Sequence, residues 1–161
     1  RKDVADWRLD RAPAGAVARV AALVGGGTPE QADSLGQLFE TFGTAFQIVD
    51  DLLGVFGLES ETGKTTIGDL REGKRTVMIA YATSTREWAS VEPVFGTEDL
   101  TEADAARIRD VLVGCGAKNF TEGLARYYTN RALARLAEPH IPPALRLELH
   151  PLADDVLGRV K

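Results

Sequence analysis

The amino-acid sequence predicts an all-α protein, and three observations lead to this prediction. Apolar residues recur at intervals of three and four over long segments, which is the spacing of a helix that buries one face. Glycine and proline separate these segments, and no segment alternates strictly between apolar and polar residues as a half-buried strand does. The chain has 161 residues, 44% of them hydrophobic and 27% charged, which is enough for one sizeable core. We therefore expect residues 1–161 to form a single domain.

The first two predicted helices lie toward the N-terminus. The segment "APAGAVARVAALVGGG" predicts a short apolar helix that ends at Gly25–Gly27. A long helix is predicted over residues 30–56, because large apolar side chains recur there at helical spacing. Thr28 is its predicted N-cap. Pro29 suits the first helical position because its missing N–H has no helical partner there.

The middle of the chain predicts a loop followed by two helices. Residues 57–75 are polar and rich in glycine, so we expect a loop or a short irregular turn. The segment "TVMIAYATSTREWA" predicts the return of a helix. In "LTEADAARIRDVLVGCG", Thr101 is the predicted N-cap and Asp104 lies three residues later, a spacing close to that of a capping box.

The C-terminal part predicts two more helices. The segment "FTEGLARYYTNRALARLAE" is amphipathic and stops before Pro139. The segment "PPALRLELHPLADDVLGRVK" predicts a last helix, and we expect Pro151 to kink or break it, because proline lacks the N–H that continues a helix.

Composition excludes several classes of function. The net charge of −5 argues against a nucleic-acid binder, because phosphate contacts need a basic surface. The single Cys115 excludes an internal disulfide framework and a multi-cysteine metal site. No apolar run approaches the roughly 20 residues of a membrane span, and no secretory signal opens the chain. We therefore expect a cytoplasmic protein without an integral membrane segment.

Two adjacent carboxylates in the long helix pose the main question. In "FGTAFQIVDDLLGVFG", Asp50 and Asp51 lie among apolar residues, and Gln47 and Gly54 share their face of the helix. Burial of an unpaired carboxylate costs several kcal/mol, so this strip must meet a wet cavity, a cation or basic groups. Mg²⁺ fits because it prefers oxygen ligands and is often held by one or two carboxylates and a phosphate. An internal salt bridge or a helix cap is the alternative, and the pair alone leaves it open.

The segment that follows supplies positive charge. "TGKTTIGDLREGKRT" contains Lys64, Arg71, Lys74 and Arg75, with glycines that permit tight turns. It is not a basic patch, because acidic residues are interspersed with the basic ones. It is not a nucleotide-binding P-loop either, since the first glycine is missing at the required spacing and a helix precedes it.

Together these segments resemble the trans-isoprenyl diphosphate synthases, also called polyprenyl synthetases. "GTAFQIVDDLLGVFG" and "TGKTTIGDLREGKRT" resemble the second aspartate-rich region of that family, and the "GA" turn and "IPP" further on resemble its C-terminal helices. The resemblance covers roughly residues 15–161 and implies a helical bundle of the isoprenoid synthase type. It also implies an Mg²⁺-dependent enzyme that condenses isopentenyl diphosphate with an allylic diphosphate to make geranylgeranyl- or farnesyl-type products.

The resemblance further implies roles for individual residues. Asp50 corresponds to a ligand of Mg²⁺, and Asp51 to the next position of the metal motif, which often acts through water. The residues expected at the substrate are Gln47 facing the reacting allyl group, Lys64 and Lys74 at the diphosphate, and Phe46 in the cavity wall.

Two departures from the family pattern change what we expect of the chain. Gly54 stands where the motif has its third aspartate, and no first aspartate-rich motif occurs in these residues. The chain therefore resembles the C-terminal half of a prenyl synthase, either as part of a longer enzyme or as a subunit that another chain completes. We expect its partner to be a second copy or a chain with the missing half, and the 161 residues alone to be inactive or nearly so. The alternative is a catalytically inactive regulatory or scaffolding subunit.

Overall fold

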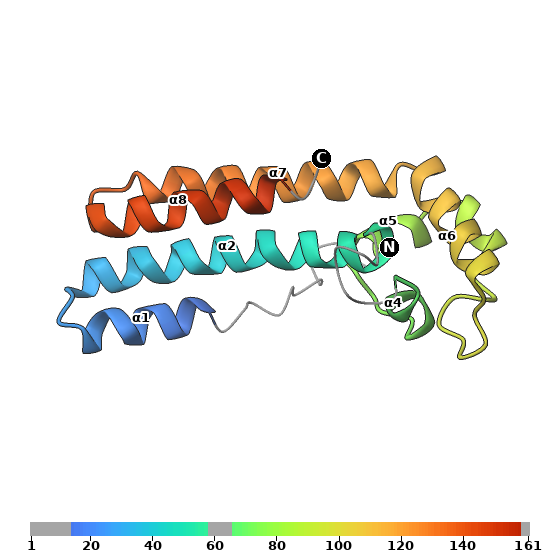
Figure 1. Cartoon of the computed structure of the whole chain (residues 1–161), viewed down its shortest axis with the longest axis horizontal. Helices are drawn as coiled ribbons and strands as arrows, with labels where there is room; N and C mark the ends of the chain where they lie inside the picture. The colour runs from blue at the N-terminus through green and yellow to red at the C-terminus, as the bar shows by residue number, and fades with distance from the viewer. Residues whose placement is uncertain (1–13, 58–65, 159–161) are drawn as a thin grey trace. The chain divides into compact units, whose positions relative to one another are not determined.

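The computed structural model of the chain describes residues 14–57 and 66–158. In these two ranges the chain forms helices and turns and no strand, which confirms the all-α prediction (Figure 1). The elements, in chain order, are α1 (Ala14–Val24), α2 (Pro29–Phe56), α4 (Gly68–Arg71), α5 (Val77–Thr83), the 3₁₀ helix η2 (Glu87–Ser90), α6 (Glu102–Gly114), α7 (Ala117–Leu136) and α8 (Pro143–Gly158).

The described chain divides into two compact units. One contains residues 14–47 and 124–158, and the other contains residues 48–57 and 66–123. The long helix α2 belongs to the first unit up to Gln47 and to the second from Ile48 onward. The prediction of a single domain over residues 1–161 stays a prediction.

The first unit is built from α1, the first part of α2, most of α7, and α8. Its core joins α2 to the end of α7 and the turn before α8, through the buried side chains of Leu38, Ala132, Leu136 and Ile141. Leu145 and Leu149 of α8 pack against this core, so α8 covers α7 and α2. Burial of each large apolar side chain contributes about 1.5–3 kcal/mol, so this cluster stabilises the packing of the three helices by several kcal/mol.

Helix α1 lies close to α2 at one point. A Cβ on Gly36 would collide with the side chain of Arg19, whose guanidinium pairs with Glu40 at 3.1 Å and Asp33 at 3.4 Å. Glycine at position 36 therefore lets Arg19 of α1 lie flat across α2.

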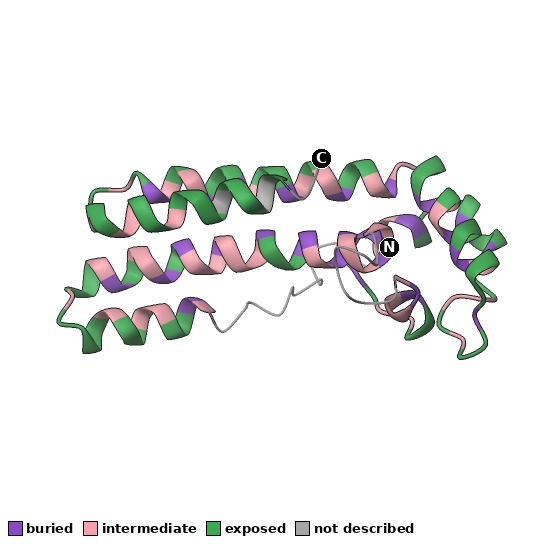
Figure 2. Ribbon diagram, in the orientation of Figure 1, coloured by how far each residue is buried: buried purple, intermediate pink, exposed green. Residues whose placement is uncertain are grey.

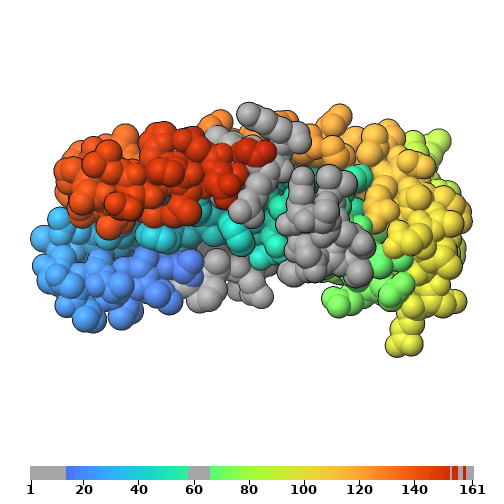
Figure 3. All heavy atoms as spheres, in the orientation of Figure 1, coloured from blue at the N-terminus to red at the C-terminus, as the bar shows by residue number. Residues whose placement is uncertain are grey.

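The outer side of α1 is apolar. Val17, Val20 and Val24 are 65%, 60% and 83% exposed, and their spacing places them along one side of the helix. Figure 2 shows that exposed residues dominate α1 and α8, and Figure 3 shows both helices at the same face of this unit.

The second unit gathers α4, α5, η2 and α6 at the C-terminal end of α2 (Figure 1). Helix α5 contacts both η2 and α6. The buried apolar residues of this unit come from all of its helices and from the turns between them: Ile48, Val49, Leu52, Val55, Ile67, Leu70, Met78, Ile79, Ala82, Trp88, Val91, Leu100, Ala105, Ile108, Leu112 and Ala117.

Both predicted N-caps are confirmed. The Thr28 hydroxyl accepts a hydrogen bond from the Gln31 N–H at 3.3 Å, and the Gln31 side-chain oxygen accepts one from the Thr28 N–H at 3.0 Å. Thr101 and Asp104 form the same reciprocal pattern at the start of α6, at 3.2 and 3.3 Å. Each capping box satisfies two N–H groups that the helix itself leaves without partners.

Three local predictions need correction. The helix predicted from "TVMIAYATSTREWA" ends at Thr83, and the segment continues as a turn and the separate 3₁₀ helix η2. The predicted loop over residues 57–75 contains the short helix α4, although its part from 58 to 65 lies outside the described residues. Of the kink or break expected at Pro151, the break is wrong, because α8 continues through the proline, and the kink stays a prediction. Leu147, four residues earlier, is exposed, so water can satisfy the carbonyl that the proline leaves without a helical partner.

No helix within residues 14–57 and 66–158 is long and apolar enough to cross a membrane.

Candidate active site

The second unit brings carboxylates of α2 together with the segment around α4. The ammonium nitrogen of Lys74 lies 3.0 Å from Asp51 Oδ1 and 3.1 Å from Asp69 Oδ2. Asp51 is buried, with only 4% of the residue exposed. A buried carboxylate is tolerated when a cation neutralises it, so Lys74 explains why the apolar helix can hold Asp51. Asp51 therefore forms the internal salt bridge that the sequence leaves open as an alternative to a metal site.

The backbone around α4 fixes where Lys74 begins. Its N–H donates to the Asp69 carbonyl at 3.0 Å, which closes the turn after α4. Gly73 makes this turn with a φ of 66°, a conformation that favours glycine, and a Cβ there would lie 3.0 Å from the Cα of Gly96. Thr76 then caps α5 through the Ile79 N–H. Lys74 is thus held between two anchored turns.

The electrostatics of this cluster favour a charged lysine. Burial works to lower the pKa of Lys74, but its hydrogen bonds to Asp51 and Asp69 more than offset that effect, and the pKa is raised. An ammonium group has three N–H donors, and these two carboxylates take two of them. The third is left to donate to another acceptor, such as a phosphate oxygen.

The other predicted residues on α2 lie nearer to solvent. Asp50 is partly exposed, Gln47 is exposed, and Phe46 is 52% exposed. An accessible carboxylate next to a neutralised one suits a cation that keeps several waters. The metal role of Asp50 and Asp51, and the substrate roles of Phe46 and Gln47, stay predictions.

Lys64, the second predicted diphosphate lysine, lies outside the described residues, and its role also stays a prediction. Among residues 14–57 and 66–158, no three histidine, cysteine or carboxylate side chains gather closely enough to hold a metal ion.

The sequence does not predict the contacts of two residues in this region, Asp69 and Arg109. Asp69 counts, in the sequence, only as one of several acidic residues in a polar loop, whereas the fold turns it toward α2 and Lys74. Arg109 of α6 donates to the Val55 carbonyl at 2.7 Å and to the carbonyl and hydroxyl of Thr66 at 3.2 and 2.9 Å. No sequence signal marks Arg109, because its partners are 54 and 43 residues away.

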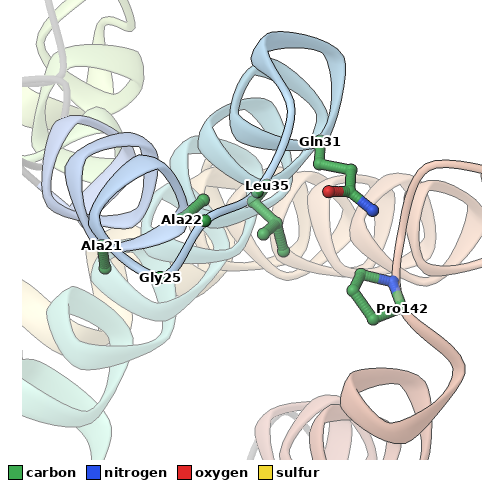
Figure 4. A pocket seen from close by; sticks show the side chains of 8 residues that line it. Ala21, Ala22, Gly25, Gln31, Leu35 and Pro142 are labelled. Atoms are coloured by element: carbon green, nitrogen blue, oxygen red, sulfur yellow. The ribbon is translucent and has the colours of Figure 1, made fainter.

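The first unit has a hollow of about 330 Å³ between the end of α1 and the start of α2 (Figure 4). Gln31 is the only polar side chain among the residues that line it, and it already serves the cap of α2. Small and apolar residues make up the rest of the lining: Ala21, Ala22, Gly25, Gly26, Gly27, Leu35 and Pro142. The hollow offers no charged group for a diphosphate.

Comparison with known proteins points to one family. The sequence model of the family described as "Polyprenyl synthetase" matches residues 14–112. The geranylfarnesyl diphosphate synthase of Aeropyrum pernix is 34% identical over 165 residues, which cover 99% of this chain and 52% of that protein. The geranylgeranyl diphosphate synthase of Methanosarcina mazei is 30% identical over 144 residues, with 89% and 43% covered. The chain spans about half the length of the curated relatives it matches.

Solved structures agree with these sequence matches. Geranylgeranyl pyrophosphate synthase from Corynebacterium glutamicum, complexed with isoprenyl diphosphate and magnesium, gives a TM-score of 0.77 at 36% identity. That match covers 87% of this chain and 41% of the synthase. A decaprenyl diphosphate synthase from Rhodobacter capsulatus gives 0.77 at 31% identity, with 92% and 46% covered.

Proposed function

Because this chain belongs to the polyprenyl synthetase family, we propose that it supplies one side of the active site of a prenyltransferase that condenses isopentenyl diphosphate with an allylic diphosphate. The observation that carries the proposal is the charge arrangement on α2. The buried Asp51 is neutralised by Lys74, and the partly exposed Asp50 stands next to it in the segment that the family model matches. The names of the relatives support this substrate class.

Asp50 and Asp51 would hold the metal in this proposal. The donor set fits Mg²⁺, since both residues offer carboxylate oxygens and Asp50 is open to a cation that keeps its waters. When bound, the metal would stabilise negative charge on the diphosphate. Asp51 keeps its ion pair to Lys74 and stays buried, so we assign Asp50 the direct contact and Asp51 a contact through water.

The remaining residues bind and orient the substrate. Lys74 donates its third N–H to a diphosphate oxygen and so stabilises the charge that grows as the C–O bond to the allyl group breaks. Gln47, exposed on the same helix, turns its amide oxygen toward the positive charge that develops on the allyl carbons. Phe46 helps to exclude water, and Lys64 is a second cation for the diphosphate.

The rest of the site lies outside these 161 residues in our proposal. The relatives are about twice as long, and the sequence holds no first aspartate-rich motif. The only other aspartate pair in the sequence, Asp154 and Asp155, lies in the last helix, α8. The complementary residues would come from elsewhere in the same polypeptide or from a partner chain. A cytoplasmic location stays a prediction.

Binding of inorganic pyrophosphate in the presence of Mg²⁺, measured by titration calorimetry, tests the proposal. We expect Asp50→Asn to weaken binding about tenfold or more, because a charge-assisted contact is worth about 1.5–3 kcal/mol. Asp99→Asn makes the same chemical change on an exposed turn of the same unit and should leave binding unchanged. Equal losses from both substitutions would show that the carboxylates of α2 serve structure alone, as a regulatory or scaffolding subunit would need.

A further inference from the structure

The position of Asp69 depends on the glycine at position 54. A Cβ built on Gly54 would lie 3.0 Å from Cγ of Asp69 and nearer still to its Oδ2. The distance from this Cβ to Oδ2 would be about as short as the distance between the Cβ and a carboxylate oxygen of one aspartate, so the two atoms could not both be accommodated. The Asp69 carboxylate therefore occupies the space into which a side chain at position 54 would extend.

This carboxylate is also one of the two that hold Lys74. Asp69 Oδ2 lies 3.1 Å from the lysine nitrogen, and Asp51 Oδ1 binds the same nitrogen from α2 at 3.0 Å. Two fixed acceptors leave the third N–H of the ammonium with one direction, whereas a single acceptor lets the group turn about that bond. Asp69 and Lys74 are each only partly exposed, so water competes weakly for this contact.

We propose that Asp69 is the positioning residue for Lys74, and that it supplies from α4 a carboxylate that α2 lacks at Gly54. Gly54 and Asp69 then form a matched pair. The missing side chain on α2 makes room for the carboxylate from α4, and this carboxylate holds the ammonium against Asp51. The consequence for diphosphate binding rests on the proposed function, but the placement of Lys74 does not.

Nuclear magnetic resonance of the lysine ammonium groups tests this placement in the 161-residue chain without metal or diphosphate. The five lysines of the sequence limit overlap, and Lys74→Arg identifies the Lys74 signal. We expect slow proton exchange for Lys74 in the unmodified chain. Asp69→Asn should speed its exchange about tenfold or more, because a hydrogen bond between charged groups is worth about 1.5–3 kcal/mol. Gly54→Ala should do the same, because the new Cβ displaces Asp69.

Two further variants separate positioning from general loosening of the fold. Gly123→Ala, also in a helix, adds a Cβ where nothing lies within 4 Å, and it should leave the Lys74 signal unchanged. The exchanged pair Gly54→Asp with Asp69→Ala returns a carboxylate to the same space and should restore slow exchange to within about threefold. Circular dichroism of each variant checks that the helices remain.

Unchanged exchange in Asp69→Asn or in Gly54→Ala would overturn the proposal, and so would failure of the exchanged pair to restore it. These outcomes are independent of the pyrophosphate titration. If the chain bound no pyrophosphate while the exchange results held, the proposed function would fail and the role of Asp69 would stand.

Discussion

Asp50 and Asp51 are neighbours in sequence, yet the fold gives their carboxylates different surroundings. Successive residues of a helix point about 100° apart, so one of the two faces the buried side of α2 and the other lies partly in solvent. Asp51 is neutralised by Lys74 within the chain. Asp50 can therefore serve a ligand at a smaller cost to folding.

Replacement of Lys74 by methionine leaves the buried Asp51 without this cation. We expect the free energy of unfolding at neutral pH to fall by about 2–3 kcal/mol, below the range for a fully buried pair because Lys74 is about one-third exposed. Denaturant unfolding measures the loss. Lys118→Met is the matched control, because Lys118 is about as exposed as Lys74 but its partner Glu122 is less buried than Asp51. Lys118 also lies over the Phe56 ring at 5.3 Å, and its loss should cost about 1 kcal/mol. Equal losses would mean that burial of Asp51 is not what makes Lys74 important.

The raised pKa of Lys74 predicts how stability depends on pH. Burial opposes the shift, but the hydrogen bonds to Asp51 and Asp69 raise the pKa above its ordinary value of 10.5. The stabilisation is then fully present below pH 10.5 and is lost as the pH rises through the higher folded-state value. We expect the free energy of unfolding to decline more steeply between about pH 9 and about pH 12 in the unmodified chain than in Lys74→Met. Parallel curves would contradict this account.

The C-terminal end of α2 depends on a helix that comes much later in the chain. The last carbonyls of a helix lack helical partners, and Arg109 of α6 supplies one for Val55 while it also binds Thr66. Arg109 thereby joins the residues on either side of the segment 58–65, which contains Lys64.

Arg109→Ala should therefore loosen the end of α2. We expect a loss of about 2 kcal/mol in the free energy of unfolding, because the lost hydrogen bonds involve a charged donor. Hydrogen exchange should quicken at the Gly57 N–H, which donates to the Leu53 carbonyl at 2.9 Å in the last turn of α2. Arg107→Ala, two residues earlier and exposed, should leave Gly57 unchanged. Slow exchange at Gly57 in both variants would show that α2 needs no support from α6.

Sequence reasoning locates the helices better than the contacts between them. Periodicity and the caps at Thr28 and Thr101 are local signals, and they predict α2 and α6 almost to the residue. The four-residue helix α4 is too short to show a period. The position of Asp69 depends on the packing of α4 against α2 at Gly54, and the residue pattern of the segment 57–75 does not indicate that contact. The contacts of Arg109 could not be predicted for the same reason, because its partners lie far away in the sequence.

The family match and the absence of the first aspartate-rich motif determine what we expect of these 161 residues when they are isolated. The relatives are about twice as long, and these 161 residues contain no counterpart of the family's first aspartate-rich motif. Departure of a diphosphate requires stabilisation from both sides, and loss of one preorganised contact typically costs about 10²–10³ in rate. Loss of an entire facing motif should cost far more.

The purified 161-residue chain should therefore show no measurable prenyl transfer by itself. The assay combines the chain with Mg²⁺, isopentenyl diphosphate and geranyl diphosphate, and detects longer products by mass spectrometry. Addition of the N-terminal half of a family member gives a positive control for complementation. Robust turnover by the chain alone would contradict the proposal that it supplies only one side of the active site. It would mean that two copies build a full site.

The exposed valines of α1 have a practical consequence for the purified chain. Val17, Val20 and Val24 present branched apolar side chains to water along one side of a helix. Sulfate and similar salts strengthen the burial of such surface, whereas cooling weakens it. The chain should therefore be salted out of solution by ammonium sulfate more readily when warm than when cold. A single Val20→Lys substitution should raise its solubility limit without disturbing the Lys74 cluster.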